Sequence, residues 1–135
     1  MVQVRQSEAL TVEPAEWSAA VAAHLAAAET PEALEDLRIQ VQCGDARAFR
    51  VRKGGVDVGA YVLRIDETPT GNDGVLLSGA GSAGVDLTAA LIPYIENQFQ
   101  GVDAIRVPTN RPGLVRKLRA QGYETAAIVM RKELP

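Results

Sequence analysis

The clearest candidate for binding chemistry in this chain is a run of glycines with the spacing G-x-G-x-x-G. Gly79, Gly81 and Gly84 follow the apolar stretch 75–78 and precede a segment with helical spacing. Glycines allow a backbone to approach a pyrophosphate closely, and the free N–H groups and dipole of a following helix stabilise its charge. The pattern therefore predicts a phosphate-binding loop between a strand and a helix.

Dinucleotide-binding proteins share this glycine pattern, but two features separate the chain from them. The next predicted strand, 104–107, runs into a Pro-Thr-Asn turn, where those proteins place an acidic residue for the ribose. About 50 residues follow Gly84, which is short for a doubly wound sheet. A nucleotide-binding protein nevertheless stays open as an alternative.

Cysteine and histidine each occur once, as Cys43 and His24. A disulfide framework needs paired cysteines, and a zinc site needs several Cys or His ligands, so neither is expected. Cys43 fits a small buried hydrophobe, and His24 fits a packing position beside an apolar helix stripe. We therefore expect no metal site.

Composition and charge fit one domain, spanning residues 1–135, with 47% hydrophobic and 23% charged residues. No run approaches the ~18 apolar residues of a membrane helix, and the N-terminus lacks a signal-peptide pattern, so we expect a cytoplasmic protein without membrane contact. Residues 104–135 hold seven basic and two acidic residues, a net +5, while the rest carries −8. This asymmetry suits a small phosphorylated ligand. With 4% aromatic residues and a net charge of −3, nucleic-acid binding is not expected.

Hydrophobic spacing and turn residues predict an α/β order of elements that would position the glycine loop. The predicted helices begin at Glu13-Pro14, Thr30-Pro31, Asp86 and Gly113, and they end near Leu25, Gly44, Gly101 and Gln121. The predicted strands cover 46–52, 56–66, 75–78, 104–107 and 125–131, and a first strand at 2–5 is left open. Turns are predicted at 53–55 and 69–74.

This order of elements, together with several C-terminal motifs, resembles the GNAT superfamily of acyl-CoA-dependent N-acetyltransferases. The matching residues are Ala104-Ile105-Arg106-Val107, Asn110, Leu114-Val115-Arg116-Lys117-Leu118, Gln121-Gly122-Tyr123-Glu124 and Met130-Arg131-Lys132. They follow the family's sequence of strand, asparagine, helix, Gly-aromatic-Glu and terminal strand, and the resemblance covers roughly 46–132. The segment 109–116 is also reminiscent of small GNAT-like proteins of bacteriophages.

The resemblance implies an α/β fold with a central mixed, twisted sheet of five to seven strands, flanked by about four helices. It also implies acetyl-CoA as cofactor, with the pantetheine between two splayed strands and the pyrophosphate on the amides of the glycine loop. The residues that it assigns to acetyl-CoA are Gly79, Ala80, Gly81, Ser82, Ala83, Gly84, Asn110 and Arg116.

Two positions depart from the family's pattern. Asp86 stands where the phosphate loop has its second glycine, and no Arg or Gln occurs in 75–86. Leu118 stands where many members carry the tyrosine that protonates the departing thiolate. An aspartate beside a pyrophosphate is repulsive, so we expect acyl-CoA binding to be weak or absent and expect Asp86→Gly to strengthen it.

The remaining catalytic candidates are carboxylates and phenols, which can accept or donate a proton during acyl transfer. Glu67, beside Asp66 at the end of the predicted central strand, is a candidate general base. Tyr94 and Tyr61 are candidate general acids in place of the missing tyrosine.

Three functions therefore stay open. The first is an N-acetyltransferase that moves an acyl group from acyl-CoA to an amine or protein acceptor. The second is a catalytically inactive GNAT-like domain that serves as a binding or assembly module, and the third is a nucleotide-binding protein. A homodimer is left open in each case.

Overall fold

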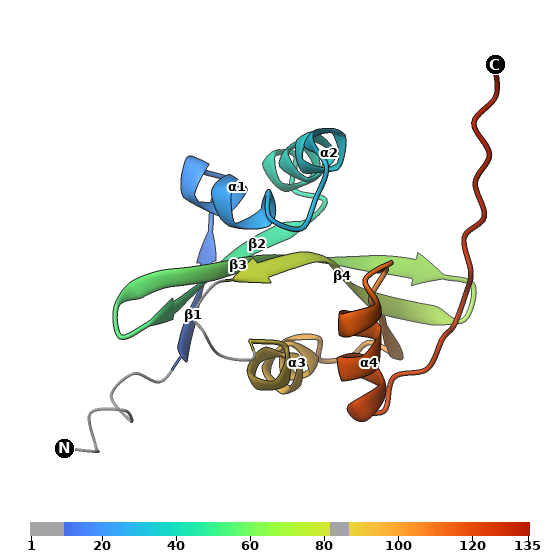
Figure 1. Ribbon diagram of the computed structural model, residues 1–135. Coiled ribbons are helices and arrows are strands. Elements are labelled where there is room, and N and C mark those ends of the chain that lie inside the picture. The colour runs from blue at the N-terminus through green and yellow to red at the C-terminus, as the bar shows by residue number, and fades with distance from the viewer. Residues whose placement is uncertain (1–9, 82–86) are drawn as a thin grey trace.

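The computed structural model describes residues 10–81 and 87–135, which form a three-layer α/β arrangement (Figure 1). Its strands are β1 (Leu10–Ala15), β2 (Arg47–Lys53), β3 (Val56–Thr68), β4 (Gly71–Gly81) and β5 (Ala104–Arg106). Its helices are α1 (Ala19–Leu25), α2 (Pro31–Gln42), α3 (Leu87–Gln98) and α4 (Pro112–Ala120). Helices α1 and α2 cover one face of the sheet, and α3 and α4 cover the other. The expected mixed sheet of five to seven strands with four helices is confirmed.

The sheet has the strand order β1-β2-β3-β4-β5. Neighbouring strands are antiparallel except β4 and β5, which are parallel. Two glycines with positive φ, Gly54 at 59° and Gly55 at 83°, make the tight turn between β2 and β3. A doubly wound dinucleotide-binding sheet is mostly parallel, so the described sheet does not support the nucleotide-binding alternative.

Strand β3 is buried on both faces over residues 58–63, as its sequence predicts. Tyr61 and Leu63 belong to the apolar cluster that also includes Ile95 of α3 and Phe99, the residue after α3. Val62 belongs to a second cluster, with Val21 of α1 and Leu37 of α2. The strand thus separates two cores, one under each helical layer.

Helix α2 begins as predicted, because the Thr30 hydroxyl accepts a hydrogen bond from the Ala33 N–H at 3.1 Å and Pro31 follows it. The prediction of a helix from Glu13-Pro14 is wrong. Pro14 lies in β1, which is an edge strand, the kind of strand in which proline is tolerated, and α1 begins after Ser18. Cys43, expected to be buried, is exposed because it caps the C-terminus of α2.

Strand β4 is longer at both ends than the predicted 75–78. At its start, the Asn72 N–H donates to the Asp103 carboxylate at 3.0 Å, and the Asp103 N–H donates to the Asn72 carbonyl at 2.8 Å. At its end, Gly79 and Gly81 pair with β3 residues Tyr61 and Gly59. The first two glycines of the motif are therefore strand residues, which corrects the prediction that the loop begins at Gly79.

The prediction of a last strand at 125–131 is also wrong. The segment after α4 forms no helix or strand and is exposed throughout residues 124–135. The predicted strand at 2–5 and the predicted helix cap Asp86 lie outside the described residues. In the ranges that are described, no helix is long and apolar enough to cross a membrane.

Candidate functional site

The site begins where β4 and β5 part. The two strands pair only over Asp73–Val75 and Ala104–Arg106, after which β4 continues to Gly81. On the other side, Val107 is followed by Pro108, which lacks an N–H and so cannot donate to a strand ladder. Among the described residues, the edge of β4 over 76–81 has no strand partner on the β5 side.

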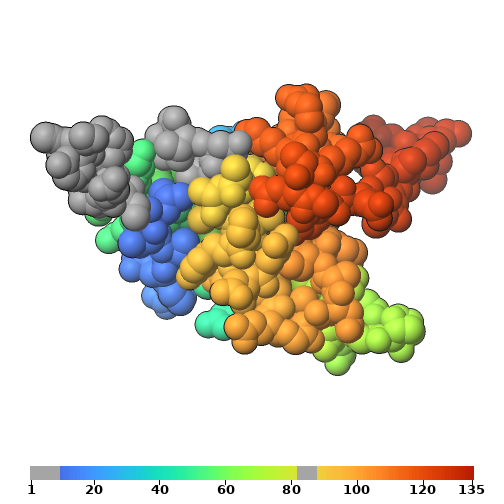
Figure 2. Space-filling view, turned by 90° about the horizontal axis from the view of Figure 1, so that it is seen from below, coloured from blue at the N-terminus to red at the C-terminus, as the bar shows by residue number. Residues whose placement is uncertain are grey.

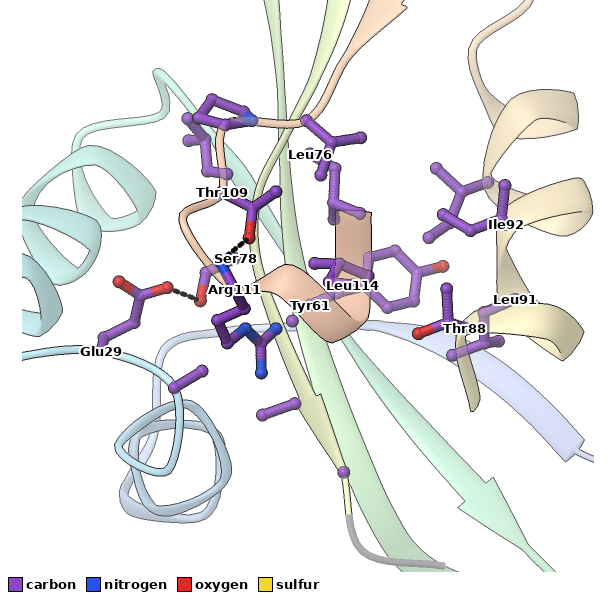
Figure 3. A pocket seen from close by; sticks show the side chains of 18 of the residues that line it. Glu29, Tyr61, Leu76, Ser78, Thr88, Leu91, Ile92, Thr109, Arg111 and Leu114 are labelled. Carbon is purple, nitrogen blue, oxygen red and sulfur yellow. Dashed lines mark hydrogen bonds between the residues drawn. The ribbon is translucent and has the colours of Figure 1, made fainter. Parts of the chain in front are cut away.

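A cavity of about 640 Å³ lies in this gap, within the size range of small-ligand sites (Figure 3). Its apolar lining includes Ala60, Tyr61, Leu76, Leu91, Ile92 and Leu114. Its polar lining includes Glu29, Ser78, Thr88, Asn110, Arg111 and Lys117. The glycine-containing end of β4 borders it through Gly79, Ala80 and Gly81.

A carboxylate reaches the cavity from the connection between α1 and α2. Ser78 of β4 is 6% exposed, and its hydroxyl donates a hydrogen bond to a Glu29 carboxylate oxygen at 2.6 Å. Ser78 pairs with Val62, whose side chain belongs to the core under α1 and α2, so the Glu29–Ser78 pair lies on that side of the sheet. Glu29 is the one carboxylate among the described residues that line the cavity.

The opposite side of the cavity is formed by α3 and by Tyr61, as Figure 3 shows. The Tyr61 ring stacks on Phe49 with centroids 5.1 Å apart, and its hydroxyl donates to the Gln98 side-chain oxygen at 2.6 Å. Burial raises the pKa of the Tyr61 phenol, so the group stays neutral. The cavity thus connects the two faces of the sheet through the gap beside β4.

Two cations add positive charge on the α4 side. Arg111 and Lys117 line the cavity, and the Arg111 N–H donates to the Thr109 hydroxyl at 3.1 Å in the turn before α4. Asn110 lines the cavity in the same turn. The site therefore combines a carboxylate on one face with two cations of α4, Arg111 at its N-cap and Lys117 in its last turn.

The predicted acetyl-CoA residues fall into three groups. Gly79, Ala80, Gly81 and Asn110 border the cavity. Arg116 borders a separate surface hollow on α4, with Pro112 and Val115. Ser82, Ala83 and Gly84 lie outside the described residues.

The predicted catalytic candidates lie elsewhere, except for Tyr61. Glu67 is exposed next to the β3–β4 hairpin and pairs with Asn72, and Tyr94 is 45% exposed on α3. Neither is among the residues described as lining the cavity. Asp66 is held by Arg64 and Arg106, whose hydrogen bonds lower the pKa of its carboxyl.

Sequence reasoning missed Glu29 and Ser78 entirely. They are 49 residues apart and meet only because α1 packs against the face of β3 and β4. Glu29 immediately precedes Thr30, whose capping role gave the stronger local signal. No spacing rule connects a residue before one helix to a strand three elements further along the chain.

No family model matches the sequence, and no curated protein matches it. Solved structures do match. A transcriptional regulator from Bacillus halodurans C-125 is 14% identical, with a TM-score of 0.70 over 93% of this chain and 100% of that one. A ribosomal-protein-alanine N-acetyltransferase from Brucella melitensis biovar Abortus 2308 is 19% identical, with a TM-score of 0.67 over 93% and 100%. Glucosamine-6-phosphate N-acetyltransferase from Arabidopsis thaliana is 14% identical, with a TM-score of 0.64 over 95% and 100%.

Proposed function

We propose that this chain, which has the fold of the GNAT acetyltransferases, transfers an acyl group from acyl-CoA to an amine. The observation that carries the proposal is the gap between β4 and β5. There, the unpartnered edge of residues 76–81 borders a cavity whose lining comes from both faces of the sheet. An acyl-transfer site needs residues from two sides in this way, because the acyl donor and the acceptor must meet at one point.

The residues present fit an acyl-CoA, which supplies an activated thioester carbonyl when bound. The strand edge at 76–81 offers backbone N–H and C=O groups to an extended chain with amide groups, such as pantetheine. Arg111 and Lys117 supply positive charge for phosphate groups. Asn110 and the glycine segment 79–84 complete the proposed cofactor side, and Arg116 belongs to it through the family resemblance.

On the other face, Glu29 is the residue that we assign to the acceptor amine. A carboxylate beside the acyl position can bind an ammonium group and take up the proton that the amine must lose before it attacks the carbonyl. The hydrogen bond from Ser78 fixes one carboxylate oxygen and leaves the other for the amine. Glu29 therefore replaces Glu67 as the proposed general base.

The experiment is an assay of free-thiol release from acetyl-CoA, with a panel of diamines, amino sugars and N-terminal peptides as acceptors. Glu29→Gln keeps the size of the side chain, and we expect kcat/KM to fall by about 10²–10⁴-fold. Glu32→Gln is the matched control, because Glu32 is exposed at the start of α2, and its rate should equal that of wild type. Equal rates for Glu29→Gln and wild type would contradict the role of Glu29.

One observation favours the second candidate, a GNAT-like module that binds without catalysis. Leu118, at the position of the family's proton-donating tyrosine, is 5% exposed and packs in the core with Phe99. The phenol that does line the cavity, Tyr61, is engaged with Gln98. Acetyl-CoA binding without thiol release for any acceptor in the panel would establish this second function.

A further inference from the structure

Strand β5 is short, and one wall of the cavity begins directly at its end. It pairs with β4 over residues 104–106 alone, and Arg106 is the last residue of this ladder. The residues that follow, 107–111, all line the cavity. Figure 2 shows, from the side of α3 and α4, the β3–β4 hairpin projecting beside the segment that contains β5. The position of Arg106 therefore decides where this wall starts.

Arg106 is bound to both neighbouring strands through its side chain. Its Nε donates to a carboxylate oxygen of Asp73 in β4 at 3.0 Å, and a terminal nitrogen donates to Asp66 in β3 at 2.7 Å. The two carboxylate side chains are 21% and 26% exposed, so water and salt screen these pairs less than pairs on an open surface. One guanidinium thus ties β5 to β4 and β3 where the gap begins.

The aspartate that receives Arg106 is itself held in place from the other side. Arg64 donates to both carboxylate oxygens of Asp66, at 2.6 and 3.0 Å, and to the side-chain oxygen of Gln40 in α2 at 2.7 Å. Two-pronged contacts of this kind fix the geometry of a carboxylate better than a single contact does. Asp66 is therefore a fixed anchor for Arg106 and connects β5 to α2.

We propose that Arg106 is a positioning residue for the acyl-CoA site. Its ion pairs with Asp66 and Asp73 hold β5 where it diverges from β4, and so keep Asn110 and Arg111 at the distance from β4 that the bound ligand needs. Arg106 is not among the residues described as lining the cavity, so it acts through the wall that follows it. The choice of ligand rests on the proposed function, whereas the anchoring of the wall is measurable without any ligand.

The chain offers a matched control for the loss of such an anchor. Asp57, in the β2–β3 hairpin, also accepts from two arginines, from Arg50 at 2.7 Å and from Arg52 at 3.0 Å. Its side chain is 27% exposed, close to the 26% of Asp66. Asp66→Asn and Asp57→Asn therefore remove equivalent charges, and the first of them alone loosens β5.

The first measurement is hydrogen exchange of the backbone amides in the full chain without ligand, at a temperature where every variant is folded. Arg106→Gln and Asp66→Asn should speed exchange at 104–106 and at Arg111 by at least about threefold, while Asp57→Asn leaves these amides unchanged. Arg106→Lys keeps the charge and should recover part of the protection. The double variant of Arg106→Gln and Asp66→Asn should exchange like Arg106→Gln alone, because both changes break the same contact.

The second measurement is the dissociation constant of acetyl-CoA by calorimetric titration of the same variants. Arg106→Gln should raise it about 3–30-fold, as expected for a residue that acts on a site without touching the ligand, and Asp57→Asn should leave it at the wild-type value.

Three results would overturn the proposal. Exchange at 104–106 that stays unchanged in Arg106→Gln would show that the ion pairs do not hold β5. Faster exchange spread evenly over all elements, or an equal effect of Asp57→Asn, would show a contribution to general stability alone. Local loosening with unchanged acetyl-CoA affinity would show that the wall does not position the ligand. A wild type that binds no acetyl-CoA would instead overturn the proposed function, and the exchange rates would still decide whether Arg106 anchors the wall.

Discussion

Gly74 lies in the ladder where β4 and β5 pair before they diverge around the cavity. Its replacement by alanine tests how closely Phe99 packs against this ladder. Gly74 pairs with Ile105 in the short parallel ladder from which β4 and β5 diverge. The ring of Phe99, the residue that follows α3, lies directly over it. A Cβ at position 74 would lie 2.6, 2.7 and 2.8 Å from three ring carbons, where ordinary contacts begin at 3.4 Å.

The loss of stability in Gly74→Ala depends on whether the Phe99 ring can move away from the added methyl group. Phe99 is 6% exposed and packs in the core cluster with Ile92 and Ile95, so it cannot turn into solvent. Inserting one methyl group into a filled core costs about 1–3 kcal/mol. For a chain of this length we expect Gly74→Ala to lower the melting temperature by about 4–12 °C.

Urea denaturation followed by circular dichroism measures the free energy of unfolding of each variant. Gly113→Ala in α4 is the control, because a Cβ there meets nothing closer than 3.9 Å and alanine should stabilise the helix by about 0.4–1 kcal/mol. Phe99→Leu in the Gly74→Ala background should recover part of the loss. If Gly74→Ala unfolds at the same urea concentration as wild type, the close packing of Phe99 on Gly74 is refuted.

Two further predictions concern polar groups. Hydrogen bonds from Arg64 and Arg106 lower the pKa of Asp66, so the stability that this carboxylate contributes is complete above its unfolded pKa and is lost as the pH falls through its lower folded pKa. In Asp66→Asn, the free energy of unfolding should therefore fall less steeply below about pH 4 than in wild type, as measured by urea denaturation at a series of pH values. An equally steep fall in both proteins would contradict the pairing. Tyr61→Phe removes the hydroxyl that donates to Gln98 and should lower the free energy of unfolding by about 1 kcal/mol in the same assay. A variant as stable as wild type, or more stable, would show that this hydrogen bond contributes nothing to stability.

The sequence predicted those helices, turns and strands that are determined by residues close together in the chain. Thr30-Pro31 starts α2 because a cap and a first-turn proline act within four residues. Gly54-Gly55 makes a hairpin because positive φ is needed at both positions. The doubly buried pattern of 58–63 likewise predicted a central strand covered on both faces.

Elements and contacts that depend on residues far away in the sequence were not predictable from residue types and spacing. Glu13-Pro14 is compatible with a helix start and with an edge strand, and pairing with β2 decides for the strand. Gly79 and Gly81 look like loop residues, but the ladder with β3 continues through them. The Glu29–Ser78 contact depends on tertiary packing alone, so residue types and spacing carried no sign of it.

The proposed function requires that the gap between β4 and β5 binds an acyl-CoA. Calorimetric titration of the full chain with acetyl-CoA, alongside NADH and ATP, tests it most directly. We predict that one acetyl-CoA binds per chain, weakly because Asp86 is expected to repel the pyrophosphate, but at least about tenfold more tightly than NADH or ATP. The affinity should fall as salt screens Arg111 and Lys117. No heat of binding with acetyl-CoA, or equal binding of NADH, would contradict the claim.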